Sequence, residues 1–296
     1  MSNTVYKIIT ERIIEELRNG VIAWEKPWVN GTCPPRGYEM APGKSYTGVN
    51  RFLVPFEGEY LTRKMVEKYH GRIIDPAKSY VITYLAKYGQ QTETDEDGNE
   101  TMTVGRQRVC LLYYRVFHIS NIEGIPSRVK TRSDNADSLR PIETAEDVVR
   151  RWVEASGVKI NVTHGDSAGY EEASDTIILP SMDQFANEES YYSVLFHEMV
   201  HSTGHEARLC RDVQKAAYSN AGEARFTREE LVAEIGAAFL MSRCGLDVTK
   251  VIRNTAARIQ GWIDALSADS RMVVWAAAKA EKAVSLILGN GAQEEQ

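Results

Sequence analysis

The 296-residue sequence predicts an α+β fold divided into two domains. Strand-like and helix-like patterns both occur, and the helix-like ones dominate the second half of the chain. A polar stretch without periodicity, residues 126–140, separates the two regions. We therefore expect a first domain at 1–126, a linker at 127–142, a second domain at 143–288 and a tail at 289–296.

The first domain is expected to combine helices with an antiparallel sheet. An amphipathic helix opens the chain, and Gly20 is in place to end it. Two runs rich in β-branched and aromatic residues flank an acidic segment that contains Asp97-Gly98-Asn99, which is typical of a β-hairpin. The patterns predict helices at 4–18 and 61–69 and strands at 78–89 and 108–120.

The second domain is expected to be mostly helical. Thr144 is a suitable N-cap for its first helix, and Gly245 follows the end of a later one. The strand expected at 175–180 is either an edge strand that could pair with an extended peptide or an ordinary core strand. The patterns predict helices at 143–156, 191–202, 226–243, 251–266 and 271–288, and strands at 158–164 and 175–180.

Charge is unevenly distributed between the two domains. The net charge is −6, but residues 1–130 carry +3 and the remainder carries −9. Five acidic residues of the first part lie in one segment, 92–100. A basic domain joined to an acidic one favours a polyanionic partner for the first domain, although a solvated surface without a partner has the same charge.

Composition excludes several classes of protein. Apolar residues make up 43% of the chain, which is enough for a packed core. No run approaches the roughly 18 apolar residues of a membrane span, and the N-terminus lacks the apolar segment of a secretory signal. The four cysteines form no C-x-x-C pair, which suits free thiols in a reducing compartment. We therefore expect a cytoplasmic protein with no membrane partner.

The main functional motif is H-E-x-x-H at 197–201. Residues four apart lie on the same face of a helix, so His197 and His201 can each offer a ring nitrogen to one Zn²⁺ ion, or to another divalent metal. Glu198 lies beside them and can take a proton from a zinc-activated water. This pattern predicts a metallopeptidase-type site with Glu198 as the catalytic residue.

A third metal ligand is needed, and the residues just after the motif do not supply it readily. The sequence continues as H-x-x-G, but Ala207 stands where a metzincin has its third histidine. His205 is close, yet Gly204 is expected to end the helix and misdirect the ring. The third ligand is therefore expected further along the chain.

The helix expected at 226–243 offers three acidic candidates for the third ligand, Glu229, Glu230 and Glu234. Glu229 shares a face with small residues, including Gly236, that would allow close approach to the metal helix. Glu230 is the alternative, since Glu234, four residues on, could then be the acidic partner of a ligating histidine. We prefer Glu229, narrowly, over Glu230.

Aromatic and basic residues are interleaved near the N-terminus, in a loop-like region rich in Pro and Gly. Single-stranded nucleic acid is bound by stacking its bases on aromatic rings and by holding its phosphates with Lys and Arg. Alternatively, the tryptophans fill the core between helix and sheet. The candidate DNA-binding residues are Trp24, Lys26, Trp28, Lys44, Tyr46, Asn50 and Arg51.

Over nearly its full length the chain resembles the ArdC-type antirestriction proteins of conjugative plasmids. In the first domain the resemblance rests on WEKPW, GKSYTGVNR and YRVFHISNIEGI. In the second it rests on DTIILP, YYSVLFHEMVHSTGHEARL and FTREELVAEIGAAFLMS.

The resemblance implies a first domain that binds single-stranded DNA without strong sequence preference and a zincin-like, SprT-related metallopeptidase domain after it. It also implies protection of incoming plasmid DNA from host restriction. SprT-related peptidases use a third histidine, whereas this chain offers an acid.

Three functional hypotheses follow. In the first, the zinc site hydrolyses peptide bonds of DNA-bound proteins, with Glu198 as general base and then proton donor. In the second, the protein protects DNA by coating single strands, and its metal site is structural or vestigial. In the third, the chain is a regulatory peptidase unrelated to DNA.

Overall fold

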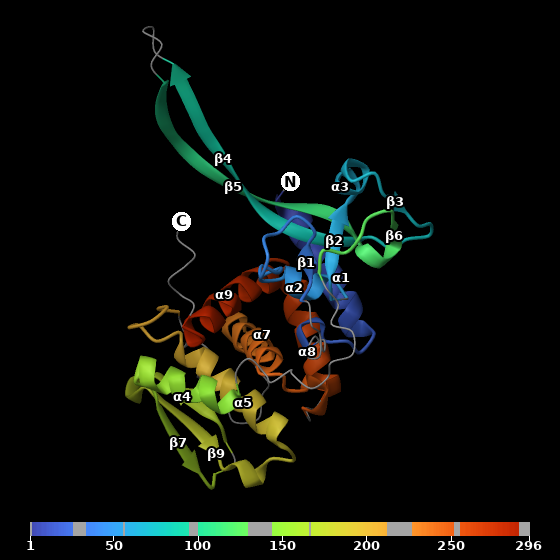
Figure 1. The fold of residues 1–296 in the computed structure, drawn as a ribbon. Coiled ribbons are helices and arrows are strands. Elements are labelled where there is room, and N and C mark those ends of the chain that lie inside the picture. The colour runs from blue at the N-terminus through green and yellow to red at the C-terminus, as the bar shows by residue number, and fades with distance from the viewer. Residues whose placement is uncertain are drawn as a thin grey trace.

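The structure is a computed structural model that describes residues 2–25, 34–55, 57–94, 100–129, 144–165, 167–211, 227–251 and 255–289. Figure 1 shows three regions: an N-terminal sheet with a long projecting hairpin, a central group of helices, and a small sheet at the opposite end. The helices are α1 (Ser2–Arg18), α2 (Asn50–Leu53), α3 (Arg63–Lys68), α4 (Ala145–Ser156), α5 (Glu188–Ser202), α7 (Arg228–Arg243), α8 (Thr255–Ala268) and α9 (Met272–Ile287). The strands are β1 (Arg36–Gly37), β2 (Glu59–Thr62), β3 (Arg72–Ile73), β4 (Tyr80–Thr94), β5 (Glu100–His118), β6 (Ile122–Glu123), β7 (Lys159–Thr163), β8 (Gly169–Glu171) and β9 (Thr176–Pro180).

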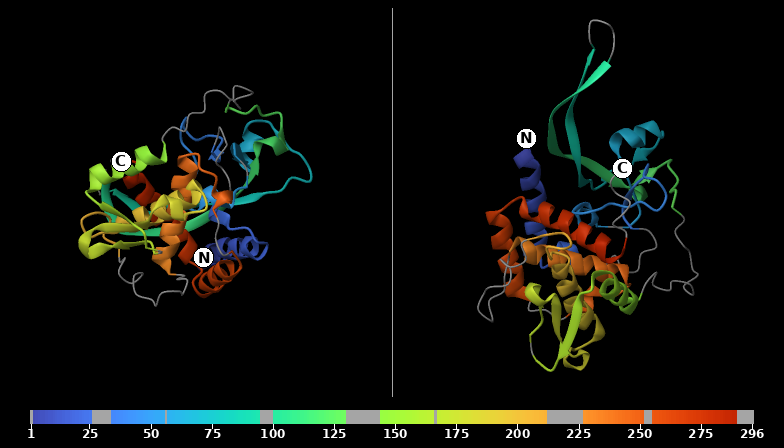
Figure 2. Two further views of the ribbon diagram at one scale, coloured as in Figure 1. Left: turned by 90° about the horizontal axis from the view of Figure 1, so that it is seen from below. Right: turned by 90° about the vertical axis from the view of Figure 1, so that its left-hand side faces the viewer.

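The N-terminal sheet has the strand order β1-β2-β5-β4, and a separate β3-β6 pair lies beside it. β4 and β5 form an antiparallel hairpin whose register runs from Tyr80↔Val116 to Thr94↔Glu100, with an irregularity between Tyr88 and Gln90. Because two long strands leave the sheet together, the hairpin extends well beyond the body of the protein (Figure 1 and the right-hand view of Figure 2). The expected antiparallel hairpin is therefore present.

The helix expected at 61–69 is only partly correct. The chain remains extended through Thr62, where β2 pairs with β5, and α3 begins at Arg63. Thr62 caps the helix, because its side chain accepts a hydrogen bond from the backbone N–H of Met65. Leu61 belongs to the strand since its side chain is fully buried in the core below the sheet.

The second sheet, β7-β9-β8, decides between the two interpretations of residues 175–180 in favour of a core strand. β9 is the central strand, because it pairs in parallel with β7 and antiparallel with β8. β8 has only three residues, Gly169–Glu171, which is too short for a period-two pattern to reveal it. The main chain of 176–178 is therefore occupied on both sides, so this part of the strand has no open edge for a bound peptide.

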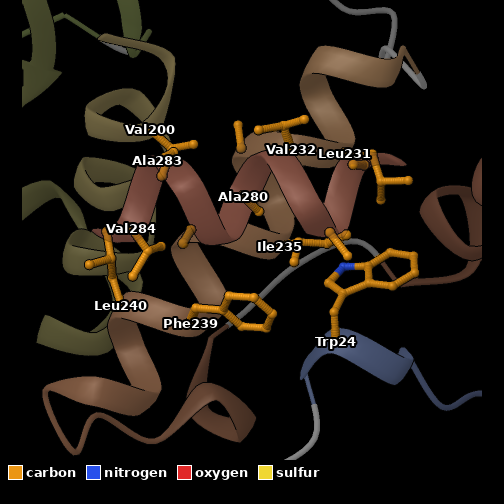
Figure 3. Packing of buried hydrophobic residues seen from close by; sticks show 14 of the residues in the cluster. Trp24, Val200, Leu231, Val232, Ile235, Phe239, Leu240, Ala280, Ala283 and Val284 are labelled. Atoms are coloured by element: carbon orange, nitrogen blue, oxygen red, sulfur yellow. The ribbon is translucent and has the colours of Figure 1, made fainter. Parts of the chain in front are cut away.

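Helices α5, α7 and α9 form the centre of the molecule. Helix α7 packs against both of the others, and eleven of its 16 residues are buried. Figure 3 shows side chains of α7 meeting Ala280, Ala283 and Val284 of α9. α7 approaches α5 closely at Gly236, where an added Cβ would lie 2.7 Å from a methyl of Val200. The expected small-residue contact between these two helices is therefore present.

A single hydrophobic core joins the two halves of the chain. α1 packs on α8, and Trp24 meets Trp262 edge to face at 6.0 Å between ring centroids. Figure 3 shows Trp24 entering the core beside Ile235 and Leu231 of α7. The expected domain limits stay a prediction, because residues 130–143, which hold most of the linker, and 290–296 lie outside the described residues. None of the described helices has the length and hydropathy that a bilayer span requires.

Candidate metal centre

Helix α5 places two imidazole rings on one face. It begins after Asn187, whose side chain accepts a hydrogen bond from the backbone N–H of Ser190, and it ends at Ser202. One turn separates His197 from His201, and their Nε2 atoms lie 3.1 Å apart. Both rings therefore direct the same nitrogen toward a common point.

Helix α7 brings a carboxylate to that same point. Its N-cap Thr227 accepts a hydrogen bond from the backbone N–H of Glu230, which sets the phase of the first turn. Glu230 Oε2 lies 3.3 Å from His197 Nε2, and Glu230 Oε1 lies 3.6 Å from His201 Nε2. The three side chains offer ligand atoms that all lie within 4.8 Å of one another.

The spacing of these atoms fits a divalent metal. Zinc–ligand bonds of about 2.0–2.1 Å in a tetrahedron separate neighbouring ligand atoms by about 3.3 Å. The separations of 3.1, 3.3 and 3.6 Å are close to that value. Two imidazoles and one carboxylate are also ligands that suit zinc and leave a fourth position for water or substrate.

Glu229 does not occupy the ligand position that the sequence analysis preferred for it. Its Oε1 lies 3.5 Å from Nδ1 of His201, the ring nitrogen that faces away from His197. Glu230, the alternative, is the acid that meets the two Nε2 atoms. Adjacent helix residues point about 100° apart, so the assignment depends on how α7 is rotated against α5, which the sequence pattern does not fix.

The expected role of Glu234 is also corrected. Its carboxylate forms an ion pair with Arg258 of α8. The acid that contacts the ring of a candidate ligand histidine is Glu229, and such contacts fix the orientation of a ligating imidazole.

Arg211 is the site residue that sequence reasoning missed. Its guanidinium donates to both carboxylate oxygens of Glu229, at 2.8–3.2 Å, and to Thr203 Oγ1 and the Val200 carbonyl, each at 2.8 Å. The side chain is buried. Arg211 follows the end of the motif helix by nine residues without a recognisable pattern, so no signal in one sequence identifies it.

Electrostatic interactions stabilise the charged forms of Glu229 and His201. Burial raises the pKa of Glu229, but hydrogen bonds from His201 and Arg211 outweigh it and hold the pKa below the usual value. Burial lowers the pKa of His201, whereas Glu229, Glu198 and Glu230 raise it, and the net result is a raised pKa. Glu229 is therefore an ionised carboxylate that attracts the Nδ1–H of His201.

Glu198 lies beside the candidate ligands and is 8% exposed. Within the described part of the chain no group hydrogen-bonds its carboxylate. His205 lies beyond the end of α5, and its Nδ1 accepts a hydrogen bond from the backbone N–H of Ala207. His205 is thus outside the group of converging ligand atoms, as expected from Gly204.

Two of the aromatic DNA-binding candidates are buried, and for Trp24 this agrees with the alternative of a tryptophan that fills the core. Trp24 is 1% exposed and packs against Trp262, so neither face of its ring is open to a base. Tyr46 is buried beneath the sheet, where burial raises the pKa of its hydroxyl. Lys26 and Trp28 lie outside the described residues.

Two further candidates hold the fold together. Asn50 donates to the Thr83 carbonyl and accepts from its backbone N–H, each at 2.7 Å, which ties α2 to β4. Arg51 pairs with Glu281 of α9 at 3.2 Å. Lys44 is exposed, and it remains available to a phosphate.

Two family models match the chain, one in each half. Residues 3–117 match the family described as the N-terminal domain of the anti-restriction factor ArdC. Residues 147–279 match the family of zincin-like metallopeptidases, and this range contains His197, His201 and Glu230. The expected two-domain α+β architecture with a zincin-like second domain is confirmed.

Several proteins are similar along almost the whole chain. Two DNA primase TraC proteins of Escherichia coli are 29% and 30% identical over 96% and 95% of this chain, which covers only 20% and 26% of their own lengths. Protein y4eC of Sinorhizobium fredii is 23% identical over 94% of this chain and 89% of its own.

Solved structures of the antirestriction protein ArdC from plasmid R388 resemble this one. A metal-free and a Mn(II)-bound structure each have a TM-score of 0.67 and cover 98% of this chain and 99% of theirs. Their sequences are 27% and 26% identical to it. The resemblance thus includes a relative whose structure holds a divalent metal.

Proposed function

Since the chain belongs to the ArdC-type antirestriction family, we propose that it binds single-stranded DNA and carries a zinc-dependent peptidase site that acts on DNA-bound proteins. In this way it protects incoming conjugative plasmid DNA from host restriction. The observation that carries the enzymatic part is the convergence of His197, His201 and Glu230 on one point, with Glu198 on the same helix. The priming activity named for the longer TraC proteins is not assigned to this chain.

His197, His201 and Glu230 hold the metal, and Glu229 orients the ring of His201. A zinc ion at this position supplies Lewis acidity for an amide carbonyl and for water. Glu198 has a largely buried carboxylate to which no described residue donates a hydrogen bond, so it can accept a proton from water and return it to the leaving amine. Burial on α5 and α7 keeps these groups in a fixed arrangement.

The enzymatic proposal is tested with Glu198→Gln and His197→Ala. Metal content is measured on the purified proteins, and cleavage is measured on a DNA-binding protein offered with and without single-stranded DNA. Glu198→Gln should keep the metal and lose cleavage, whereas His197→Ala should lose both. Wild-type protein that binds metal but cleaves nothing, and whose antirestriction effect survives Glu198→Gln, would instead support the non-catalytic alternative of a DNA-coating protein.

The DNA-binding proposal is tested separately by fluorescence anisotropy with labelled single-stranded and double-stranded oligonucleotides. Single strands should bind more tightly than duplex, with little dependence on sequence and with an affinity that falls as salt rises. An absence of binding at low salt would refute this part and leave the peptidase proposal standing.

A further inference from the structure

We infer that single-stranded DNA binds in the cavity between the base of the β4–β5 hairpin and helix α9, a surface to which both halves of the chain contribute. The inference rests on the proposed single-stranded DNA binding and names its location. The cavity has a volume of about 1280 Å³. Residues 47–50 and the hairpin line one side, and α9 lines the other.

Exposed aromatic rings are the first observation. Tyr84, Tyr113 and Tyr114 are 36%, 41% and 47% exposed, and they are the only exposed large aromatic side chains among the residues whose burial the structure describes. Leu85, beside them, is 64% exposed. All four residues lie on one hairpin, so exposed apolar side chains are concentrated where β4 and β5 leave the sheet, with Tyr84 and Tyr114 on one face of the hairpin and Leu85 and Tyr113 on the other. Such concentration marks an interaction surface.

The geometry of two of these rings suits a base. Tyr84 and Tyr114 are stacked with centroids 4.7 Å apart and planes 4° from parallel, and their hydroxyl oxygens lie 3.0 Å apart. Tyr84 also lines the cavity. An aligned pair of flat rings at a cavity edge can be extended by an unpaired base, which offers the same flat face whatever its identity.

Cationic side chains line the wall of the cavity that α9 and its N-cap residue form. Arg271 and Lys282 are both exposed and line the cavity, as does Arg228 at the start of α7. The carboxylate on this wall, Glu281, is engaged by Arg51 and by the backbone N–H of Gly48. Arg228 is paired with Asp269, so Arg271 and Lys282 are the cations of this wall that complement a phosphate backbone.

Aromatic and cationic groups alternate across the cavity. Trp275 of α9 lies under the guanidinium of Arg228 at 5.7 Å, and Tyr6 of α1 lies under that of Arg271 at 5.6 Å. A ligand pocket for one drug-sized molecule starts at about 300 Å³. On that scale the cavity accommodates a segment of roughly four nucleotides, at the lower end of the site sizes of single-strand-binding folds. A duplex has no free base faces to offer the tyrosines.

The inference differs from the sequence-based expectation in a specific way. The candidates near the N-terminus were chosen because aromatic and basic residues are close in sequence, but Trp24 and Tyr46 are buried. The exposed rings lie on strands β4 and β5. The cations that line the same cavity, Arg271 and Lys282, lie at α9, more than 150 residues away in the chain. Only the folded structure places them together.

The test compares three variants by fluorescence anisotropy with a labelled oligo(dT). Tyr84→Ala/Tyr114→Ala should weaken binding by about tenfold or more, since base–aromatic stacking contributes about 1–3 kcal/mol per base. Tyr84→Phe/Tyr114→Phe should bind like wild type, because stacking needs the rings and not the hydroxyls. Arg271→Ala/Lys282→Ala should reduce the steepness of the log–log salt dependence by about 1.4 if both side chains contact phosphates.

Lys159→Ala is the matched control. Lys159 is an exposed cation on β7, at the end of the molecule opposite the hairpin (Figures 1 and 2), and its removal should change neither affinity nor salt dependence. Wild-type binding with no change in the Tyr→Ala and Arg/Lys variants would overturn this location while leaving single-stranded DNA binding intact. Wild-type protein that binds no single-stranded DNA would overturn both proposals. Loss of protein cleavage with unchanged DNA affinity would show that the cavity takes a peptide.

Discussion

Replacing Gly236 of α7 by alanine should force that helix away from the metal-bearing helix α5. The added Cβ would lie 2.7 Å from Val200 Cγ2 and 3.0 Å from Cγ1. Favourable carbon–carbon contacts are about 3.5–4.0 Å, so a displacement on the order of 1 Å is needed. Val200 cannot turn aside, because a valine in a helix has essentially one χ1 rotamer and both of its methyls meet the new atom.

Two opposing effects set the magnitude. Alanine stabilises a helix by about 0.8–1.0 kcal/mol relative to glycine, whereas overpacking a tight core typically costs about 1–3 kcal/mol. Helix α7 is also packed against α9 through Val232 and Ala280, so it cannot relax freely (Figure 3). We expect the free energy of unfolding to fall by about 1–2 kcal/mol, with weaker metal binding because the His201–Glu230 separation changes.

A double-mutant cycle with Val200→Ala isolates the contact. Urea unfolding is measured for wild type, both single variants and the double variant, together with a metal titration of each. The double variant should be more stable than the sum of the single effects by about 1 kcal/mol or more, because the new Cβ occupies space that the valine methyls vacated. Additive effects, or a Gly236→Ala protein about 1 kcal/mol more stable than wild type, would show that this contact does not set the helix separation.

Three further changes test other parts of the structure. Arg211→Met leaves the buried carboxylate of Glu229 without its partner, so stability should fall by about 3–5 kcal/mol and metal affinity by about 10–100-fold, and adding Glu229→Gln should restore much of the stability. Asp175→Asn should lower stability at pH 7 by about 1–3 kcal/mol. The hydrogen bond from Arg208 lowers the pKa of Asp175. The pair therefore contributes to the free energy of unfolding above the unfolded-state pKa of about 3.9, and this contribution is lost as pH falls through the folded-state pKa. A stability difference between Asp175→Asn and wild type that persists at lower pH would contradict this assignment. Thr144→Ala should cost about 1 kcal/mol in thermal unfolding, because the threonine side chain accepts the backbone N–H of Asp147 at the start of α4, and an unchanged melting temperature would show that the cap is dispensable.

Local chemistry made much of the fold predictable. The helical periodicity of α1, the Thr144 cap of α4 and the aromatic strands of the hairpin each depend on neighbouring residues, and each is present as expected. The paired histidines of α5 were predictable for the same reason, since four-residue spacing on a helix determines where the rings lie.

Features that depend on tertiary contacts were not predictable in this way. The choice between Glu229 and Glu230 depends on how α7 is rotated against α5, and the central position of β9 depends on the three-residue strand β8. Arg211 acquires its role only because the chain after α5 turns back toward Glu229. In each case the sequence shows the residue type but not its neighbour.

Helix α9 contacts both the cavity proposed for DNA and the helix that carries a metal ligand, so it connects the two proposed functions. One face of α9 packs its alanines, including Ala280 and Ala283, against the α7 region that presents Glu230 (Figure 3). Another face carries Arg271 and Lys282 into the cavity below the hairpin. Because the buried side chains of α7 and α9 interlock, the cavity and the metal centre belong to one packed unit rather than to two bodies on a flexible tether. A strand held in the cavity therefore lies at a fixed position relative to the metal centre, which favours substrates that are themselves bound to that DNA over proteins free in solution.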